Sequence, residues 1–272
     1  MFNLMLITND IDLAKHAVGS GVSRVFVDLE TNGKFERQGH LDTLISNHSM
    51  QDVRNIRKVI SDSELLVRLN PFYEGTQLEI EQAISAGADL IMLPMFKTID
   101  EIKEFSRMID GRAKFVPLVE TAAAAECLTE VVQVKGVSEI YIGLNDLHRD
   151  LGLKFMFEPL ANGLLESLTA TIKKSGLPFG FGGLARIGEG TLPAELILAE
   201  HVRLGSSCVI LSRTFHRQSE SLSDLQSFMN LEDEVNKIVL ARESLLKRDL
   251  SAQLSDKQHV NDIVLSIISG NA

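Results

Sequence analysis

The sequence predicts a single (β/α)8 barrel, the TIM-barrel class of α/β fold, followed by extra C-terminal helices. A short apolar segment followed by an amphipathic segment recurs eight times along the chain. The apolar segments are continuous rather than alternating, which is typical of parallel strands that are covered on both faces. No Pro/Ser/Gly-rich linker interrupts the series, and 272 residues suffice for one barrel of this kind.

The elements follow from the positions of these segments. The apolar runs predict strands at Asn3–Thr8, Arg24–Leu29, Glu64–Asn70, Asp89–Pro94, Lys114–Val119, Glu139–Gly143, Leu177–Gly182 and Ser207–Ser212. The amphipathic segments between them predict helices at Asp10–Val18, Gln51–Ile60, Gln77–Ala86, Ile99–Ile109, Ala122–Val132, Pro159–Lys174 and Pro193–Leu204. Strand and helix alternate throughout, as a barrel requires.

The C-terminal segment departs from this repeat. We therefore expect a barrel domain over residues 1–218 and a helical extension over residues 219–272. Within the extension, Ser223–Lys247 reads as a long helix, Asp249–His259 as a polar loop and Val260–Ile268 as a last helix. The apolar residues of that last helix recur at helical spacing, which predicts packing on the barrel or on a neighbouring subunit; they are Val260, Ile263, Val264 and Ile267.

An open, doubly wound sheet is the competing fold. It needs a glycine-rich phosphate loop after its first strand, and ITNDIDLAKH contains none. The one glycine-dense loop, from Gly180 to Gly190, comes late and lacks the Lys-Ser/Thr ending of a P-loop. The sequence thus argues against nucleotide binding.

The net charge limits the possible partners. A formal charge of −10 argues against nucleic acid and anionic membranes as general partners, although a local arginine or metal can still bind an anionic substrate. The first residues, MFNLMLITND, lack a basic start and a cleavage site, and their apolar run is too short to cross a bilayer. We therefore expect a cytoplasmic location.

Polar residues gather where the predicted strands end. In this fold the chemistry lies at the carboxyl ends of the strands. The candidates there are Asp28, Glu30, Arg68, Asn70, Glu120, Asn145, Asp146, Ser212 and Arg213. Several carboxylates and an arginine are thus expected to converge on one rim.

Glu120 and Asp146 are the candidate metal ligands. They are 26 residues apart, the length of one helix plus one strand, so neighbouring strands would carry them. Two carboxylates that close repel each other unless they share a proton or a cation. Oxygen ligands suit Mg²⁺ or Mn²⁺. The alternative pairs each carboxylate with a basic residue or with a helix N-terminus.

Arg68 and His48 each permit two interpretations. Arg68 interrupts an apolar strand, either as a buried structural ion pair or as a guanidinium that holds a substrate oxygen. His48 precedes a helix in the loop after the second strand, where a lone histidine is often only a surface residue. Lys97, just past the fourth strand, is a weaker candidate for a Schiff base.

Six ordered motifs carry a family resemblance over residues 2–215. They are VDLE (27–30), NHSMQDVRNI (47–56), VRLNP (67–71), GADLIMLPMFKTIDE (87–101), PLVET (117–121) and IGLNDLHRDLGL (142–153). With these motifs the chain resembles the class II pyruvate aldolases of the HpcH/HpaI aldolase and citrate lyase β-subunit superfamily.

The resemblance implies roles for individual residues. Glu120 and Asp146 match the ligands of a divalent metal, Mg²⁺ or Mn²⁺, and Arg68 matches the arginine beside the carbonyl or enolate oxygen. His48 matches a histidine that assists proton transfer. The turn Gly143-Leu144-Asn145 matches the backbone that holds the keto-acid carboxylate, and we place Asp28, Glu30 and Asn70 in the same substrate-binding set.

The implied activity is that of a metal-dependent aldolase. It would cleave a 4-hydroxy-2-oxo acid to pyruvate, or a related 2-keto acid, and an aldehyde through an enolate. The resemblance also implies a homo-oligomer, a trimer or hexamer.

Two departures from the family pattern keep alternatives open. Residues 31–47 separate Glu30 from His48, so His40 competes with His48 as the base. VDLE and VRLN lean toward the branch that cleaves acyl-CoA thioesters, which makes a citryl- or malyl-CoA lyase the alternative. A non-catalytic binding or regulatory barrel is the third possibility.

Overall fold

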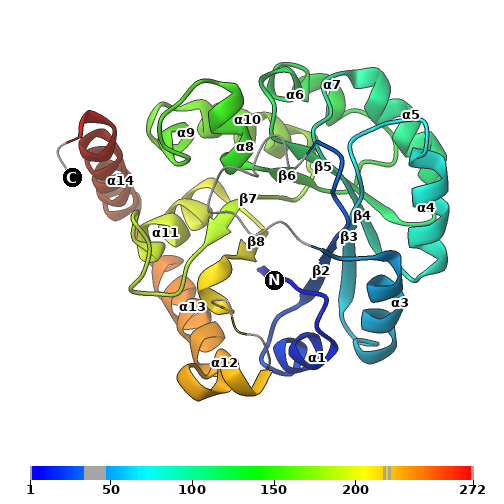
Figure 1. Ribbon diagram of the computed structural model, residues 1–272. Coiled ribbons are helices and arrows are strands. Elements are labelled where there is room, and N and C mark those ends of the chain that lie inside the picture. The colour runs from blue at the N-terminus through cyan, green and yellow to red at the C-terminus, as the bar shows by residue number, and fades with distance from the viewer. Residues whose placement is uncertain (1, 34–46, 217–218, 220–221, 271–272) are drawn as a thin grey trace.

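The computed structural model describes residues 2–33, 47–216, 219 and 222–270, and these form a closed barrel of eight parallel strands with helices around it (Figure 1). Each strand pairs with its neighbours in sequence, and β1 pairs with β8 to close the barrel. The strands are β1 (Asn3–Ile7), β2 (Arg24–Asp28), β3 (Glu64–Arg68), β4 (Leu90–Leu93), β5 (Lys114–Val119), β6 (Ile140–Ile142), β7 (Phe179–Leu184) and β8 (Cys208–Leu211). The predicted fold class is confirmed.

Helices surround the barrel and continue beyond it. Those that alternate with the strands are α1 (Ile11–Gly19), α3 (Met50–Val59), α4 (Thr76–Ser85), α5 (Ile99–Ile109), α6 (Ala122–Glu126), α7 (Leu128–Val131), α8 (Leu144–Asp150), α9 (Glu158–Ala161), α10 (Leu164–Ser175) and α11 (Ala194–Leu204). A 3-10 turn, η1 (Arg213–Phe215), follows β8, and the chain continues through α12 (Leu222–Phe228), α13 (Leu231–Leu245) and α14 (Leu250–Ser269). In the described part of the chain, no helix is long and apolar enough to cross a membrane.

The amino ends of the strands are closed by a buried ion-pair network. Arg24, at the start of β2, is 2% exposed and lies 2.8 Å from carboxylate oxygens of both Glu64 and Glu139. Above it the barrel interior is filled by large side chains, including Phe26 and Tyr141. Because this end is packed, an internal site has room only at the carboxyl ends of the strands.

The strand register brings the predicted site residues to one level. Asp28 on β2 is paired with Arg68 on the adjacent strand β3, so the Cα atoms of these two residues are direct neighbours. Val119 on β5 pairs with Ile142 on β6, which places the residues that follow these strands side by side. The neighbouring strands expected for Glu120 and Asp146 are therefore present.

The C-terminal prediction was partly wrong. The segment read as one helix from Ser223 divides into α12 and α13, because the Asn230 side chain caps a new helix by accepting from Glu232 and Asp233 N–H. Asp249–His259 is helical rather than a loop: Asp249 caps α14, which begins at Leu250. The polar residues that suggested a loop belong to a largely exposed helix. An exposed helix and a loop are both polar, so polarity alone does not distinguish them.

The apolar stripe of the last helix is covered by the chain itself. Val260 and Val264 are buried, and α14 packs against α9 and α11, at the edge of the barrel in Figure 1. The buried part of the stripe thus packs on the chain's own barrel, which is one of the two arrangements expected.

Three further boundaries differ from the prediction. The helix expected over Ala122–Val132 divides at Cys127, and that over Pro159–Lys174 divides before Gly163, whose φ of 84° ends a helical path. β7 begins two residues later than predicted because its glycines give no side-chain pattern, and it pairs irregularly with β8. Helix α8 was not predicted at all.

Candidate active site

A cavity of about 630 Å³ lies at the carboxyl ends of the strands. It is lined by ten of the residues predicted from the strand ends and motifs: Asp28, His48, Arg68, Glu120, Gly143, Leu144, Asn145, Asp146, Ser212 and Arg213. These residues come from β2, β3, β5, β6 and β8 or from the segments that follow those strands. The barrel thus brings together groups that are far apart in sequence. The competing residue His40 lies outside the described residues.

Glu120 is held rigidly at the end of β5. Its side chain is 2% exposed, and its Oε1 accepts a hydrogen bond of 3.0 Å from the backbone N–H of Met95. Met95 has a φ of 55°, a left-handed conformation that a non-glycine residue adopts only at a cost. The loop after β4 therefore carries backbone strain in the conformation that aims its N–H at this carboxylate.

The charge around Glu120 is unfavourable for its ionised form. Burial raises the pKa of Glu120 well above its usual value; Arg68 opposes the shift, and repulsion from Glu30 and Asp146 adds to it. A raised pKa means that the ionised carboxylate lacks sufficient positive charge nearby. A cation bound at this point would supply the missing charge.

Gly143 allows the close approach of β6 to Glu120. A methyl group placed on Gly143 would lie 2.8 Å from Glu120 Oε2 and 2.9 Å from Glu120 Cβ, although its φ of −86° suits any residue. The glycine is therefore required by space and not by backbone conformation.

Gly143→Ala is expected to displace the Glu120 carboxylate and to reduce activity on the order of a hundredfold, the usual cost of misplacing a reacting group by about 1 Å. Gly19→Ala serves as the matched control, because a methyl group there meets nothing within 4 Å. Turnover and the melting-temperature shift on adding Mn²⁺ are measured for both variants. A fully active Gly143→Ala protein would show that the position of Glu120 does not matter.

Asp146 lies in the first turn of α8, four residues beyond the end of β6, and not at the strand end itself. It lines the same cavity as Glu120 and repels that carboxylate. The N-cap residue of α8 is Gly143, which has no side chain with which to cap the backbone N–H groups of the first turn. Helix α8 could not be predicted from its start, because no capping residue marks it.

Arg68 forms buried ion pairs, as one of its two interpretations expects, and it also lines the cavity, as the other expects. Its Nε and Nη2 donate to the two carboxylate oxygens of Asp28 at 2.8 and 2.9 Å, and Nη2 lies 3.2 Å from Glu30. Nη1 makes no hydrogen bond within the described part of the chain. Two carboxylates thus hold the guanidinium through Nε and Nη2.

His48 contacts the same carboxyl-end loop. Its Nδ1 accepts a hydrogen bond of 3.0 Å from the backbone N–H of Asp28. A neutral imidazole that accepts at Nδ1 carries its proton on Nε2. In this arrangement His48 presents an N–H donor.

Two predicted substrate-binding residues do not line the cavity. Asn70 Oδ1 accepts from the backbone N–H groups of Thr31 and Asn32, and its Nδ2 donates to Glu79. Glu30 faces Arg68. Both support the residues of the cavity wall, Asn70 by holding the loop after β2 and Glu30 by holding the arginine.

The donor set fits a hard divalent cation bound by few protein ligands. Within residues 2–33, 47–216, 219 and 222–270, no group of three or more His, Cys, Asp or Glu side chains is arranged to hold a metal. Mg²⁺ is commonly bound by one or two carboxylates and completes its shell with water and substrate. Glu120 and Asp146 match that pattern, and the raised pKa of Glu120 agrees with it.

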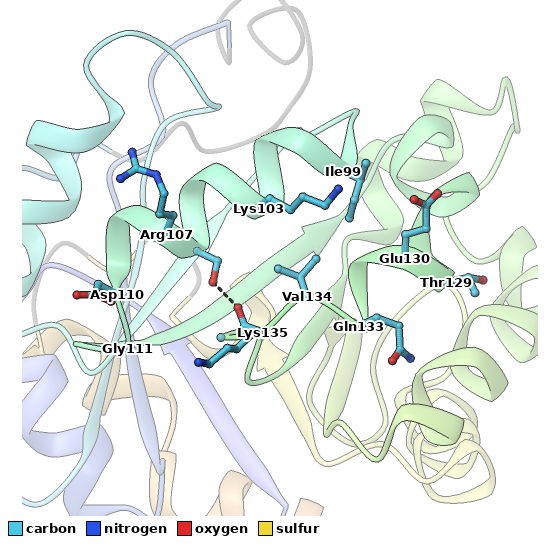
Figure 2. A pocket seen from close by; sticks show the side chains of 12 residues that line it. Ile99, Lys103, Arg107, Asp110, Gly111, Thr129, Glu130, Gln133, Val134 and Lys135 are labelled. Carbon is cyan, nitrogen blue, oxygen red and sulfur yellow. Dashed lines mark hydrogen bonds between the residues drawn. The ribbon is translucent and has the colours of Figure 1, made fainter.

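A second hollow, of about 840 Å³, lies on the outside of the barrel between α5 on one side and α7 with the segment that follows it on the other (Figure 2). The side chains of Arg107, Glu130 and Gln133 point in different directions there and do not converge. Arg107 is paired with Glu104 at 2.5 Å. This hollow lacks a set of groups aimed at one point, so the cavity at the strand ends is the better candidate site.

Several cavity residues were not among the strand-end candidates. They include Asn9, Met156 and His216. His216 lies in SRTFH, directly after the eighth strand, so extending that strand end by a few residues would have added it. Within the described chain no lysine lines the cavity, and Lys97 is exposed outside it, which gives no support to a Schiff base.

Comparisons with known proteins identify the family of the chain. The sequence model for HpcH/HpaI aldolase/citrate lyase matches residues 2–160. A search of curated proteins finds no match.

Solved structures resemble the fold over most of its length. An HpcH/HpaI aldolase from Desulfitobacterium hafniense DCB-2 is 14% identical with a TM-score of 0.62, covering 92% of this chain and 94% of that chain. An HpcH/HpaI aldolase/citrate lyase family protein from Burkholderia cenocepacia J2315 is 16% identical with a TM-score of 0.63, and the match covers 84% of this chain and 93% of that chain. Citrate synthase SbnG is 15% identical with a TM-score of 0.61, and the match covers 83% of this chain and 92% of that chain.

At these identities the solved structures support the fold, while the sequence match over more than half of the chain identifies the family. The chain belongs to the HpcH/HpaI aldolase/citrate lyase family.

Proposed function

We propose that the protein is a divalent-metal-dependent carbon–carbon lyase that cleaves a 4-hydroxy-2-oxo acid to pyruvate, or a related 2-keto acid, and an aldehyde. The observation that carries the proposal is the convergence of Glu120, Asp146 and Arg68 on one cavity, with the pKa of Glu120 raised. Cleavage beside a keto group leaves an enolate, whose negative charge needs positive groups nearby. A cation held by Glu120 and Asp146, either Mg²⁺ or Mn²⁺, would supply Lewis acidity at the keto oxygen.

The chain's own residues then divide the remaining tasks. Arg68 directs Nη1 at the enolate oxygen while Asp28 and Glu30 hold its other nitrogens. The uncapped backbone from Gly143 to Asn145 receives the keto-acid carboxylate. As the carbon–carbon bond breaks, its electron pair stays on the pyruvate fragment, and the hydroxyl group loses its proton and becomes the aldehyde carbonyl.

The hydrogen bond at Asp28 changes the role that we propose for His48. A base would need a lone pair on Nε2, which requires the proton on Nδ1, where it would face the N–H of Asp28. Two donors would then oppose each other. We therefore propose that His48 donates from Nε2 to the hydroxyl oxygen as that oxygen gains charge, while water in the cavity takes the proton.

His48→Ala tests this role. Because the hydroxyl oxygen takes no part in enolisation of pyruvate, cleavage is expected to fall about a hundredfold, more steeply than exchange of the pyruvate methyl protons. Cleavage and exchange rates are measured on the same preparation. An equal fall in both would mean that His48 acts on the keto-acid half instead.

Substrate class is resolved by a panel of aldehydes with pyruvate, tested with and without Mg²⁺ or Mn²⁺. Aldol products formed only with metal support the proposal. Cleavage of malyl- or citryl-CoA, without any aldol product, would assign the chain to the acyl-CoA branch instead. Failure of every substrate, together with absent proton exchange, would indicate a non-catalytic barrel.

We also propose that the protein is a homo-oligomer. Leucines are exposed on the C-terminal helices, at Leu240 of α13 and at Leu250, Leu254 and Leu265 of α14. A second copy would remove this apolar surface from water. Sedimentation is expected to give a species well above the 30.0 kDa of one chain at micromolar concentration, and a 30.0 kDa species would contradict the proposal.

A further inference from the structure

A buried tyrosine lies where the active-site cavity meets the packed interior of the barrel. Tyr141, in the middle of β6, is 1% exposed and lines the cavity. The residue opposite it on β7 is Gly180, and a methyl group placed on this glycine would lie 2.5 Å from Tyr141 Cε2. The tyrosine ring therefore passes directly over Gly180, and the glycine leaves the space through which the ring reaches beyond β7.

The hydroxyl group at the end of this ring bridges the next two strands. Tyr141 Oη donates to Gly182 O on β7 at 2.7 Å and accepts from the backbone N–H of Ile210 on β8 at 2.9 Å. Burial raises the pKa of Tyr141 well above its usual value, so the hydroxyl keeps the proton that it donates. One side chain of β6 thus holds a backbone group of β7 and a backbone group of β8 together.

The bridge lies at an irregular point of the β7–β8 pairing. From Gly180 to Gly183, β7 advances three residues, while β8 advances two over the same stretch, from Cys208 to Ile210. The extra residue of β7 makes a β-bulge. Gly182, within the bulge, has a φ of 55°, a left-handed conformation that glycine adopts at no steric cost. The tyrosine hydroxyl therefore holds the bulge at its left-handed residue.

The bulge is in close contact with the start of α8. A methyl group placed on Gly182 would lie 3.0 Å from Leu144 Cδ1, so the backbone of the bulge packs directly on that side chain. Leu144 is fully buried and is the first residue of α8. The backbone around it, from Gly143 to Asn145, is the segment that we propose for the keto-acid carboxylate. Movement of the bulge would therefore move this segment.

We propose that Tyr141 is a positioning residue for the keto-acid half of the site: its hydroxyl fixes Gly182 against Leu144 and so sets the position of the start of α8. This inference rests on the proposed lyase function and adds a residue to its machinery. Without the hydroxyl, Gly182 O loses a donor and the Ile210 N–H loses an acceptor. Because a buried polar group without its partner costs free energy, the bulge is expected to rearrange and to release Leu144.

Tyr141→Phe tests the proposal because it removes the hydroxyl and keeps the ring. Exchange of the pyruvate methyl protons is measured with Mn²⁺ over a range of pyruvate concentrations. KM for pyruvate is expected to rise about tenfold, the loss that corresponds to about one hydrogen bond. The kcat of exchange is expected to change less than about threefold, because Arg68 and Glu120 keep their own contacts on β3 and β5.

A second variant reaches the same contact from β7. Gly182→Ala places a methyl group against α8 and is also expected to raise KM for pyruvate. Gly176→Ala is its matched control for backbone strain, because Gly176 has a φ of 79° and a methyl group there meets nothing within 4 Å. Tyr73→Phe is the control for the loss of a hydroxyl. Tyr73 is the only other tyrosine of the chain, and its hydroxyl donates a hydrogen bond of 2.8 Å outside the cavity.

The outcomes separate this inference from the function on which it rests. A Tyr141→Phe protein that melts at a lower temperature but keeps its KM for pyruvate would overturn the inference, because the hydroxyl would then stabilise the barrel and do nothing more. If Tyr141→Phe does not fold, the glycine pair decides: an equal KM in Gly182→Ala and Gly176→Ala would overturn the inference. Each of these results leaves the lyase function intact. A wild-type protein that fails to exchange pyruvate protons at all would overturn both.

Discussion

Glu120→Gln is expected to abolish metal-dependent turnover while the metal-free protein remains at least as stable as the wild type. The substitution removes a candidate metal ligand, so a loss of at least about a hundredfold in activity is expected. It also replaces a buried carboxylate, whose pKa is raised by burial and by repulsion from Glu30 and Asp146, with a neutral amide of similar shape. Removing an uncompensated buried charge costs no stability.

Melting temperature distinguishes this role from a structural one. Mn²⁺ is expected to raise the melting temperature of the wild type, because a ligand that binds only the folded state stabilises it, and to leave the Glu120→Gln variant unshifted. Glu126→Gln, on the exposed side of α6, is the matched control and is expected to behave as the wild type. A variant that keeps both its activity and its Mn²⁺ response would exclude Glu120 as a ligand. Asp146→Asn is expected to give the same loss.

Arg68→Lys is expected to lower kcat on the order of a hundredfold, which corresponds to about 3 kcal/mol of lost transition-state stabilisation. Lysine keeps the charge, but one ammonium group cannot bind both oxygens of Asp28 and still reach the substrate. Stability is also expected to fall, because Asp28 and Glu30 lose donors in a buried site. Both kcat and melting temperature are therefore measured.

A second variant separates the catalytic from the structural contribution of Arg68. Glu30→Gln weakens the 3.2 Å contact of the guanidinium without changing any residue that lines the cavity. If Arg68 acts on the substrate, Glu30→Gln costs much less turnover than Arg68→Lys. Equal losses in the two variants would mean that Arg68 serves only as an ion-pair partner.

Much of the fold was predictable because burial leaves a strong pattern in the sequence. The β5 strand has the predicted bounds, Lys114–Val119, since a continuous apolar run is bounded by charged residues. The pattern fails where side chains carry no such signal. β7 is rich in glycine, and the first half of α14 is polar because it faces solvent.

Site residues that lie at the ends of predicted strands could be assigned from the sequence. Arg68 and Glu120 could be assigned to the cavity because each ends a strand of a barrel. Roles that depend on a single hydrogen bond could not be predicted from the sequence. The orientation of His48 depends on the backbone N–H of Asp28, and Asn70 turns toward Glu79 and the loop after β2. The left-handed conformation of Met95 has no sequence signal, since methionine seldom adopts it.

Exchange of the pyruvate methyl protons with deuterated water tests the central claim most directly, because it reports enolisation without the unknown aldehyde. We expect exchange in the presence of Mg²⁺ or Mn²⁺, loss of exchange after EDTA treatment, recovery when the metal is restored, and none in Glu120→Gln. Exchange that continues at the same rate in EDTA-treated protein, or that never occurs with any divalent metal, would contradict the assignment of a metal-dependent lyase that acts through an enolate.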